Sequence, residues 1–326
     1  MTVNKRSTDV PGQAPYQDGF PIRVLAERTG VATSTLRAWE RRYNLLTPQR
    51  TPKGHRVYSE QDARIVERVV ELLREGHSLG TIAKQIDQPE RRLARWQPEL
   101  ELNGVWRDYL EDTLRAIVDF SHERIEAVFN EASSLYPLDM AIERLIEPAL
   151  LTLGERWRSD PAGIAEEHFY SCWLRNRLGA RFHHGYSLAK GARILCACMP
   201  GDNHDIGLML FALSAQSRGY RVLYFGQDLP LEQIPLIVER SGARAVILSA
   251  RMPLTEDQER QLAALSRQSA VAAMLGGQAS DRPLPAFEAA GGVRLGSRML
   301  AAIQVLVSRV DVHSGGSGRR RASNAG

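Results

Sequence analysis

Apolar residues change their spacing twice along this chain, and the changes predict three regions of different architecture. Between about residues 21 and 86, short runs of helical spacing are interrupted by Gly30 and by a stretch rich in Pro, Gly and basic residues. Residues 104–187 show helical spacing throughout. From residue 193 onward, short apolar runs alternate with helical segments, which is the pattern of a parallel α/β sheet.

The first region reads as two short helices followed by a basic hairpin. A turn at Thr29-Gly30 separates the two helices, and Leu36 and Trp39 share one face of the second helix. Thr33-Ser34-Thr35 offers hydroxyl groups that could cap the second helix. Residues 48–58 predict a tight β-hairpin, called the wing below, and Ser59 then caps a further helix. Together these signals predict a winged helix-turn-helix.

Positive charge is concentrated in this region although the whole chain carries a net charge of only +4. Residues 20–58 hold eight Lys and Arg against two acidic residues, a balance suited to a phosphate backbone. The motifs Thr35-Leu36-Arg37-Ala38-Trp39-Glu40-Arg41-Arg42-Tyr43, Pro48-Gln49-Arg50-Thr51 and Gly54-His55-Arg56-Val57-Tyr58-Ser59-Glu60-Gln61-Asp62 resemble the MerR family.

That resemblance implies a second helix in the major groove of operator DNA and a wing against the backbone or the minor groove. The side chains that we expect to contact double-stranded DNA are Ser34, Thr35, Arg37, Arg41, Arg42, Tyr43, Arg50, Lys53, His55, Arg56 and Tyr58.

The second and third regions predict a four-helix bundle and a doubly wound parallel (Rossmann-like) domain. The bundle helices are expected at residues 105–120, 125–134, 137–157 and 165–186. Strands are expected at 194–199, 221–225, 245–248, 271–275 and 293–295, and helices at 206–218, 231–241, 255–268, 283–289 and 297–309.

These elements give a multidomain α and α/β protein with short terminal extensions. We expect a flexible lead at 1–19, the winged domain at 20–88, a linker at 89–103, the bundle at 104–190, the α/β domain at 191–311 and a disordered basic tail at 312–326. No apolar run approaches the roughly 20 residues of a membrane-spanning helix, and the lead lacks a signal-peptide core. We therefore expect a cytoplasmic protein with no membrane partner.

The polar loop after the first α/β strand contains a candidate metal ligand. It reads Asp202-x-His204-x-x-Gly207, and such sheets bind ligands at the carboxyl ends of their strands. A neutral imidazole is a good ligand for a transition metal, and a carboxylate commonly accepts a hydrogen bond from its other nitrogen. Gly207 leaves room for a bulky group at the start of the next helix. The cysteines form no CxxC pair, and Cys196 and Cys198 alternate within a strand, so we expect them to pack in the core.

Small and polar residues follow the later strands as well. Asp228, Ser249 and Gly276-Gly277, together with the His204 loop, resemble the cobalamin-binding domain of methionine synthase, corrinoid carrier proteins and mutases. The resemblance implies that His204 is the lower axial ligand of cobalt, and that Ser249, Gly276 and Gly277 line a slot for the displaced nucleotide tail. The usual Ser-x-Leu of that slot reads Ser249-Ala250-Arg251 here.

The bundle carries Trp157 followed after nine residues by Glu167-His168, with Ile164 between them. Beside a cobalamin domain this spacing resembles the MerR-family cobalamin-binding photoreceptor regulators of the CarH/LitR type. The resemblance implies that the bundle caps the upper face of adenosylcobalamin, with Trp157 against the adenosyl group and Glu167 and His168 hydrogen-bonding to it. The family pattern has a cobalt-ligating His directly after the tryptophan; here that residue is Arg158.

These observations predict a DNA-binding transcriptional regulator, a repressor, in which light cleaves the cobalt–carbon bond and changes oligomeric state and operator binding. The oligomer is expected to be a dimer or a tetramer. One alternative is a light-independent cobalamin sensor, binding methylcobalamin or another cobalamin. A more distant alternative is a corrinoid methyl-transfer protein. No nucleophile or acid–base pair stands out in the sequence, so we expect a non-enzyme.

Overall fold

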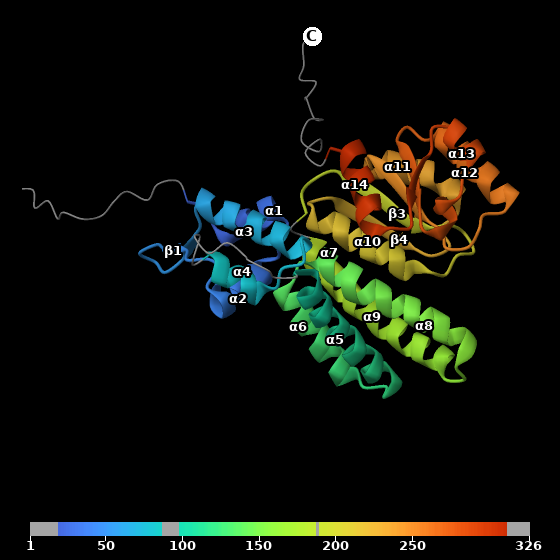
Figure 1. The fold of residues 1–326 in the computed structure, drawn as a ribbon. Coiled ribbons are helices and arrows are strands. Elements are labelled where there is room, and N and C mark those ends of the chain that lie inside the picture. Colours follow the sequence, from blue (N-terminus) through green and yellow to red (C-terminus); the bar gives the residue numbers. More distant parts are fainter. Residues whose placement is uncertain (1–18, 87–97, 187–188, 312–326) are drawn as a thin grey trace, which may run out of the picture. The chain divides into compact units, whose positions relative to one another are not determined.

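The computed structural model describes residues 19–86, 98–186 and 189–311. The chain divides into two compact units, residues 1–102 and 103–326 (Figure 1). Most of the expected lead, most of the linker and the basic tail lie outside the described residues.

The first unit is a small helical domain with a two-stranded hairpin. Gly30 separates its first two helices in a left-handed conformation (φ 71°), which glycine adopts without steric cost. Its core contains the fully buried side chains of Leu25, Leu36, Trp39 and Tyr58. The elements are α1 (Ile22–Thr29), α2 (Thr33–Tyr43), β1 (Gln49–Arg50), β2 (Arg56–Val57), α3 (Glu60–Arg74) and α4 (Leu79–Ile86).

Helix caps in this unit agree with the sequence at one helix and differ at another. Ser59 and Asp62 form a reciprocal capping box at the start of α3, as expected. Helix α2 begins at Thr33, after Ala32, and has no side-chain cap. The expected hydroxyl cap is therefore wrong, because the helix already includes Thr33-Ser34-Thr35 and Thr35 is turned into the core.

The second unit begins with four long helical segments that pack as a bundle. The third segment includes a π-helical turn, η1, which ends two residues before Pro148, whose missing N–H removes a regular helical hydrogen bond. The first helix begins at Pro98, earlier than residue 105, so the last residues of the expected linker are helical. The segments are α5 (Pro98–Val118), α6 (His122–Leu135), α7–η1–α8 (Leu138–Ala141, Ile142–Ile146, Glu147–Ser159) and α9 (Gly163–Tyr186).

A five-stranded parallel sheet forms the rest of the unit. Its strand order is β4-β3-β5-β6-β7, so the chain reverses direction across the sheet between β3 and β5. In open α/β sheets such a reversal leaves a crevice at the carboxyl ends of the two strands. Each strand lies within two residues of its predicted bounds: β3 (Arg193–Cys198), β4 (Arg221–Gly226), β5 (Ala245–Ser249), β6 (Ala272–Gly276) and β7 (Val293–Gly296).

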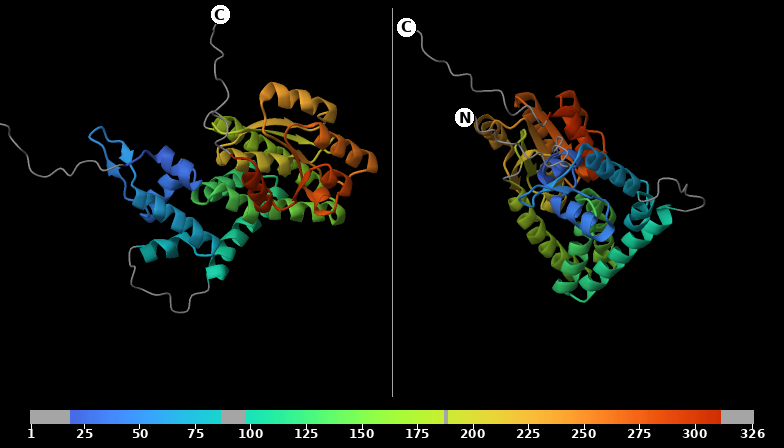
Figure 2. Two further views of the ribbon diagram at one scale, coloured as in Figure 1. Left: turned by 90° about the horizontal axis from the view of Figure 1, so that it is seen from above. Right: turned by 90° about the vertical axis from the view of Figure 1, so that its left-hand side faces the viewer.

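Helices cover both faces of this sheet, which confirms the doubly wound fold (Figure 2). One face packs against α10 and α14, and the other packs against α11, α12 and α13. Cys196 and Cys198 are buried in the first of these cores, as expected, and burial raises the pKa of the Cys198 thiol to about 12. The helices are α10 (Asp205–Ser217), η2–α11 (Leu231–Gln233, Ile234–Ser241), α12 (Glu256–Gln268), η3 (Gln278–Asp281), α13 (Pro285–Ala289) and α14 (Met299–Arg309).

Helix α10 is buried on two sides. Leu208 and Phe211 face the sheet, whereas Ile206 and Leu210 enter the core of the bundle beside Leu174 of α9. Figure 1 shows α10 between the strands and the long helices α8 and α9. A helix that is apolar on every side is typical of a fully buried element. The bundle and the α/β domain therefore share one continuous hydrophobic contact through α10. None of the described helices is long and apolar enough to span a membrane.

Replacing a bundle-facing residue of α10 tests this shared core. Leu210→Ala should lower the free energy of unfolding by about 2–5 kcal/mol, because a 1% exposed side chain leaves a cavity. Leu236→Ala, at a position 41% exposed, should change it by less than about 0.5 kcal/mol. Denaturant unfolding of both variants measures the difference. Equal effects would show that α10 does not hold the bundle.

Candidate functional site

The loop Gly201–His204 joins β3 to α10 and holds the predicted metal ligand. His204 Nδ1 lies 2.8 Å from Asp202 Oδ1, and the His204 backbone N–H donates to the same oxygen at 2.9 Å. The His204 side chain is 47% exposed, and Nε2 has no hydrogen-bond partner within the described ranges. An imidazole whose Nδ1 is held by a carboxylate and whose Nε2 faces outward is arranged to bind a metal.

Asp202 fixes the loop to the neighbouring strand. Its carboxylate is buried, and its second oxygen accepts hydrogen bonds from the backbone N–H groups of Arg251 and Met252, just after β5. Burial acts to raise the pKa of Asp202, but hydrogen bonds from His204 and Arg251 outweigh it, so the pKa lies below its usual value. Asp202 therefore carries its negative charge at neutral pH and favours a proton on His204 Nδ1.

The loop after β4 supports the His204 loop from the other side. Gly201, in a left-handed conformation (φ 81°), donates its N–H to Asp228 Oδ1 at 3.0 Å. Gln227 Nε2 donates to the carbonyl oxygen of Asn203 at 2.7 Å. Asp228 thus supports the loop directly, as part of the predicted site. Sequence reasoning did not single out Gln227, because a glutamine on a polar loop gives no signal of its partner.

The predicted tail slot is brought together at the ends of β5 and β6. Ser249 and Gly276 are paired in register, and a Cβ added to Gly276 would meet no atom closer than 3.8 Å. Gly277 differs, because its backbone (φ 86°, ψ 175°) is essentially restricted to glycine and a Cβ would lie 2.4 Å from the Ala250 carbonyl oxygen. A side chain at Gly276 would thus be in ordinary contact with Leu295 and Gly296, whereas Gly277 permits a tight turn.

The bundle residues predicted for the upper face also lie together. Trp157, near the end of α8, and His168, on α9, have ring centroids 5.8 Å apart with an interplanar angle of 34°. A tight connection brings the helices together, since a Cβ on Gly163 would lie 2.4 Å from the Arg156 carbonyl oxygen. Arg156 also donates two hydrogen bonds to the buried carboxylate of Glu166, from Nε to Oε2 at 2.8 Å and from Nη2 to Oε1 at 2.9 Å. Trp157 is 45% exposed, so a large part of its aromatic surface remains accessible.

Two more predicted residues complete this face. Glu167 accepts a hydrogen bond from Ser171 Oγ at 2.5 Å, and Ile164 is 48% exposed. Exposed Leu151, also on α8, adds an apolar side chain that sequence reasoning missed, because a leucine in a helical pattern reads as core. The name upper face is used below for Trp157, Ile164, Glu167 and His168. The side chain of Arg158 lies outside the described part of the structure.

The loop after β5 approaches helix α8 of the bundle at Arg251. Its Nη2 atom lies 3.8 Å from where a Cβ on Gly154 of α8 would stand. Arg251 follows the predicted slot directly, so the end of β5 and the helix of Trp157 border one region. Met252, the next residue, is 60% exposed there. The sequence marked Arg251 only as a departure from the usual leucine.

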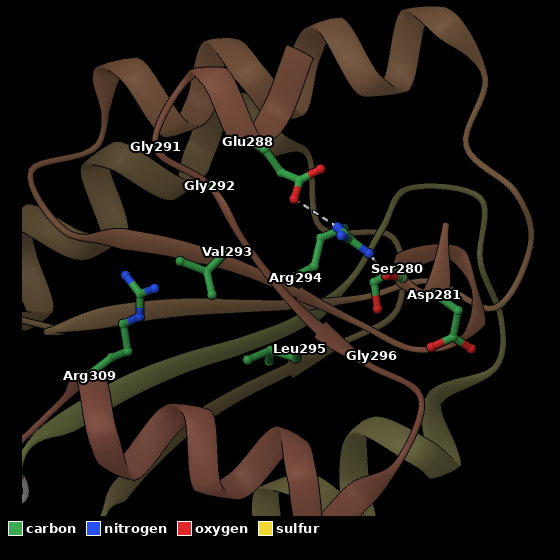
Figure 3. Close-up of a pocket in the computed structure, with 10 residues that line it drawn as sticks. All are labelled: Ser280, Asp281, Glu288, Gly291, Gly292, Val293, Arg294, Leu295, Gly296 and Arg309. Atoms are coloured by element: carbon green, nitrogen blue, oxygen red, sulfur yellow. Dashed lines mark hydrogen bonds and ion pairs between the residues drawn. The ribbon is translucent and has the colours of Figure 1, made fainter. Parts of the chain in front are cut away.

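One polar pocket adjoins the predicted slot, because Gly296 in its lining pairs with Gly276 and accepts a hydrogen bond from the Gly277 N–H. It borders the edge strand β7 and contains none of the predicted site residues (Figure 3). Arg294 in this pocket forms an ion pair with Glu288 at 3.0 Å and donates to the Ser280 carbonyl oxygen, so its charge is already balanced. Among the described residues no group of three or more His, Cys, Asp and Glu side chains could hold a metal ion.

In the winged domain most predicted DNA-contacting side chains are accessible. Arg56 is instead paired with Glu40 of α2 at 2.9 Å, which braces the wing against that helix. Thr35 and Tyr58 are 1% and 0% exposed, so the expectation that they touch DNA is corrected: their side chains pack in the core. Burial raises the pKa of the Tyr58 hydroxyl. Tyr43 is half-buried, and the exposed members are Ser34, Arg37, Arg41, Arg42, Arg50, Lys53 and His55.

Comparisons with known proteins match both the winged domain and the helical bundle. A family model described as MerR HTH family regulatory protein matches residues 20–89, and one described as B12 binding domain matches residues 109–181. The HTH-type transcriptional repressor CarH of Myxococcus xanthus is 32% identical over 222 residues, covering 66% of this chain and 73% of CarH. The repressor CarA of the same organism is 30% identical over 210 residues, covering 64% of this chain and 68% of CarA.

A solved structure shows the same fold in another protein. The monomethylamine corrinoid protein of Methanosarcina barkeri superposes with a TM-score of 0.50 at 16% identity, covering 62% of this chain and 99% of that one. A MerR-type DNA-binding domain followed by a helical bundle and a doubly wound domain defines a cobalamin-binding transcriptional regulator. The chain belongs to the CarH-type family of MerR regulators. Its relatives are transcriptional regulators, and it is a regulator rather than an enzyme.

The residues present fit a cobalamin. His204 offers one accessible imidazole nitrogen, and a Cβ on Gly207 would meet nothing within 4 Å, so the start of α10 is open to a bulky group. The small residues Ser249 and Gly276, paired in register, and the exposed aromatic surface of Trp157 meet the needs of a tail and of an upper ligand. A single protein ligand is sufficient because a corrin ring supplies the four equatorial nitrogens of its cobalt.

Replacing His204 tests the ligand assignment. In His204→Ala, bound cobalamin should lose the spectrum of imidazole ligation and bind about 10- to 100-fold more weakly, because no other described side chain occupies this position. His184→Ala is a control, since this exposed histidine of α9 bonds its own helix at the Ala180 carbonyl oxygen. Absorption spectra and titrations measure both variants. An unchanged spectrum in His204→Ala would refute the assignment.

The adjacent glycines of the slot predict opposite effects. Gly276→Ala should leave stability nearly unchanged but weaken cobalamin binding, because the new methyl group would lie 3.8 Å from Leu295 and Gly296 without a clash and would narrow the slot beside Ser249. Gly277→Ala should lower the free energy of unfolding by about 1–3 kcal/mol through backbone strain. Thermal unfolding and cobalamin titration separate the two. If Gly276→Ala binds cobalamin normally, the slot does not hold the tail.

Proposed function

We propose that this chain is a light-responsive repressor that binds operator DNA in the dark with adenosylcobalamin bound. The observation that carries the proposal is the accessible Trp157–His168 pair of the bundle, which belongs to the same compact unit as the His204 loop. An upper face with an aromatic plane, an imidazole and a carboxylate suits an adenosyl group, which offers a purine and two ribose hydroxyls. We further propose that the repressor acts in the cytoplasm.

On the lower side, His204 would ligate cobalt through Nε2, and Asp202 would keep the imidazole in the tautomer that leaves Nε2 free. Asp202 is itself held by backbone N–H groups from the β5 loop, so rotation of the His204 ring would break its hydrogen bond to a fixed carboxylate. Ser249, Gly276 and Gly277 would admit the nucleotide tail.

On the upper side, Trp157 would pack on the adenosyl group, with Ile164 beside it and Glu167 and His168 as hydrogen-bonding partners. Adenosylcobalamin supplies a cobalt–carbon bond that visible light cleaves. Without a ligand Trp157 is 45% exposed. Loss of the adenosyl group would uncover this surface again and would remove the contacts that hold α8 in place. Since α9 is packed against α10 through the shared core, we propose that α8 moves relative to this contact.

Oligomerisation would connect that movement to DNA. Several winged domains bound at once give tight operator binding from individually weak contacts, and separation of the subunits loses that gain. A ligand that contacts the two bundle arrangements differently shifts the population between them. We therefore propose a dimer or tetramer in the dark and smaller species in the light. Exposed Arg37, Arg41 and Arg42 of α2 would read the operator.

Arg158 favours a second candidate function, a cobalamin sensor that does not depend on light. A guanidinium remains protonated and cannot ligate cobalt, so the chain lacks the ligand that the family pattern places after the tryptophan. His168, which lies beside Trp157, is the imidazole available to the upper face. In this second function the upper face would report only whether a cobalamin, such as methylcobalamin, is bound. A corrinoid methyl-transfer role would leave the winged domain without a purpose.

Illumination separates the two functions. The full-length protein, loaded with adenosylcobalamin in darkness, should bind DNA from its own promoter region about 100-fold more tightly than after green light, because avidity is lost. Gel-shift titration and light scattering measure affinity and oligomer size before and after exposure.

Hydroxocobalamin, which has no adenosyl group, provides the control: the loaded protein should not respond to light. Trp157→Ala should bind adenosylcobalamin but form less of the dark oligomer. Unchanged DNA affinity and oligomer size after illumination would contradict the light-responsive function and leave the plain sensor.

A further inference from the structure

An ion pair between the bundle and the α/β domain ends directly beside the His204 loop. Arg175 of α9 forms a fork with Asp205: Nη2 lies 3.0 Å and Nε 3.2 Å from Oδ1, and Nε lies 3.3 Å from Oδ2. The Asp205 side chain is only 10% exposed and the Arg175 side chain 42% exposed. A carboxylate that is largely withdrawn from water needs such a partner, so the contact is strongly constrained in geometry.

Asp205 is the residue that follows His204, and it begins α10. The two ends of the His204 loop are thus tied down, in addition to the contacts that Gly201 and Asn203 make with the β4 loop. Asp202 ties its start to the backbone of the β5 loop, and Asp205 ties its end to the bundle. Because the imidazole lies between these two attachments, its position depends on both. Only the second attachment depends on where the bundle stands.

Helix α9 extends this connection to the upper face. Glu167, Ser171 and Arg175 follow one another at intervals of four residues, so they lie along one side of the helix. Ser171 donates to Glu167, and Arg175 donates to Asp205. One rigid helix therefore carries Glu167 and His168 at one end of this row. At the other end it carries Arg175, which pairs with Asp205 at the end of the His204 loop.

A second ion pair joins the bundle to the far end of α10 and offers a comparison within the same interface. Asp139 of α7 accepts from Arg218 Nη2 at 2.6 Å and from Ser214 Oγ at 2.9 Å. This pair also connects the bundle to α10, but Arg218 is the residue that follows the helix, at the end opposite His204. Loss of either pair weakens docking of the bundle, whereas only loss of the Arg175 pair should release the His204 loop.

We propose that Arg175 is a positioning residue that sets the orientation of His204 according to the position of the bundle. Movement at the upper face thereby alters the lower ligand of cobalt, and the lower ligand in turn restrains the bundle. The inference rests on the proposed role of His204 in cobalamin binding. It adds a route between the two faces that passes through the protein rather than through the cofactor.

The first test uses the cofactor-free, full-length protein and needs no cobalamin. Hydrogen exchange of the backbone N–H groups at residues 201–206 should become about tenfold faster in Arg175→Ala, because the loop loses its attachment to the bundle. Arg218→Ala should leave exchange in this segment unchanged and accelerate exchange near residues 214–218. Arg175→Lys, which keeps the charge but loses the fork, should fall between wild type and Arg175→Ala.

The second test determines whether an imidazole nitrogen is bound to cobalt. With cob(II)alamin bound, electron paramagnetic resonance should show nitrogen splitting from an imidazole in wild type and in Arg218→Ala. The splitting should be weakened or mixed with a species lacking nitrogen in Arg175→Ala. The dissociation rate of cob(II)alamin should rise about tenfold in Arg175→Ala and less than twofold in Arg218→Ala.

Equal exchange rates and equal spectra in Arg175→Ala and Arg218→Ala would overturn the proposal and leave Arg175 as an ordinary interface residue. Absence of imidazole splitting in wild type would contradict the proposed role of His204 instead. In that case the exchange measurement on the cofactor-free protein still decides whether Arg175 holds the loop. The two failures are therefore distinguishable.

Discussion

The burial of α10 on both of its sides is the constraint on which the rest of the second unit depends. One side of the helix packs against the sheet and the other enters the core of the bundle, so neither domain can bury its apolar surface fully without it. Since α10 begins one residue after His204, the same packing that joins the domains also fixes where the candidate ligand stands. The loop sits at the strand-order reversal between β3 and β5, where parallel α/β sheets place their ligands.

This arrangement limits how a signal can pass through the molecule. The contact of α9 with α10 is largely apolar and has the Arg175–Asp205 ion pair at one end, and Arg218 at the other end of α10 pairs with Asp139 of α7. Helix α8 instead presents exposed Leu151 and Trp157. Accessible apolar side chains are where a bound group can add or remove packing energy. A ligand at the upper face would therefore act on α8 through Trp157 and on α9 through Glu167 and His168, and α9 would pass the effect to α10 through the Arg175–Asp205 pair.

The sequence alone predicted the order of the elements because its patterns are local. Apolar strands such as residues 194–199 and the Ser59 capping box are short-range signals, and both are confirmed. The grouping of Ser249 with Gly276 follows from parallel topology, which makes the carboxyl ends of neighbouring strands meet. The comparisons confirm the family and a regulator with a cobalamin-binding domain; light sensing and the individual site residues stay predictions.

Other features depend on tertiary contacts that no local pattern records. Thr35 and Tyr58 carry polar groups typical of DNA contacts, yet helix rotation and the base of the wing place them in the core. The clamp between Arg175 and Asp205 joins residues 30 positions apart, and each alone resembles an ordinary surface charge. The early start of α5 was missed because the prolines and mixed charges of residues 88–103 predict a break in helical structure.

The central claim is that one protomer holds the cofactor from both sides, with His204 below and the bundle above. A crystal structure of the adenosylcobalamin-loaded protein, grown and measured in darkness, tests it most directly at the cobalt atom. The account predicts His204 Nε2 within bonding distance on the lower side, with the adenosyl group against Trp157 of the same protomer on the other. Cobalt bound by water or by the cofactor's own base, or an adenosyl group turned away from the bundle, would contradict it.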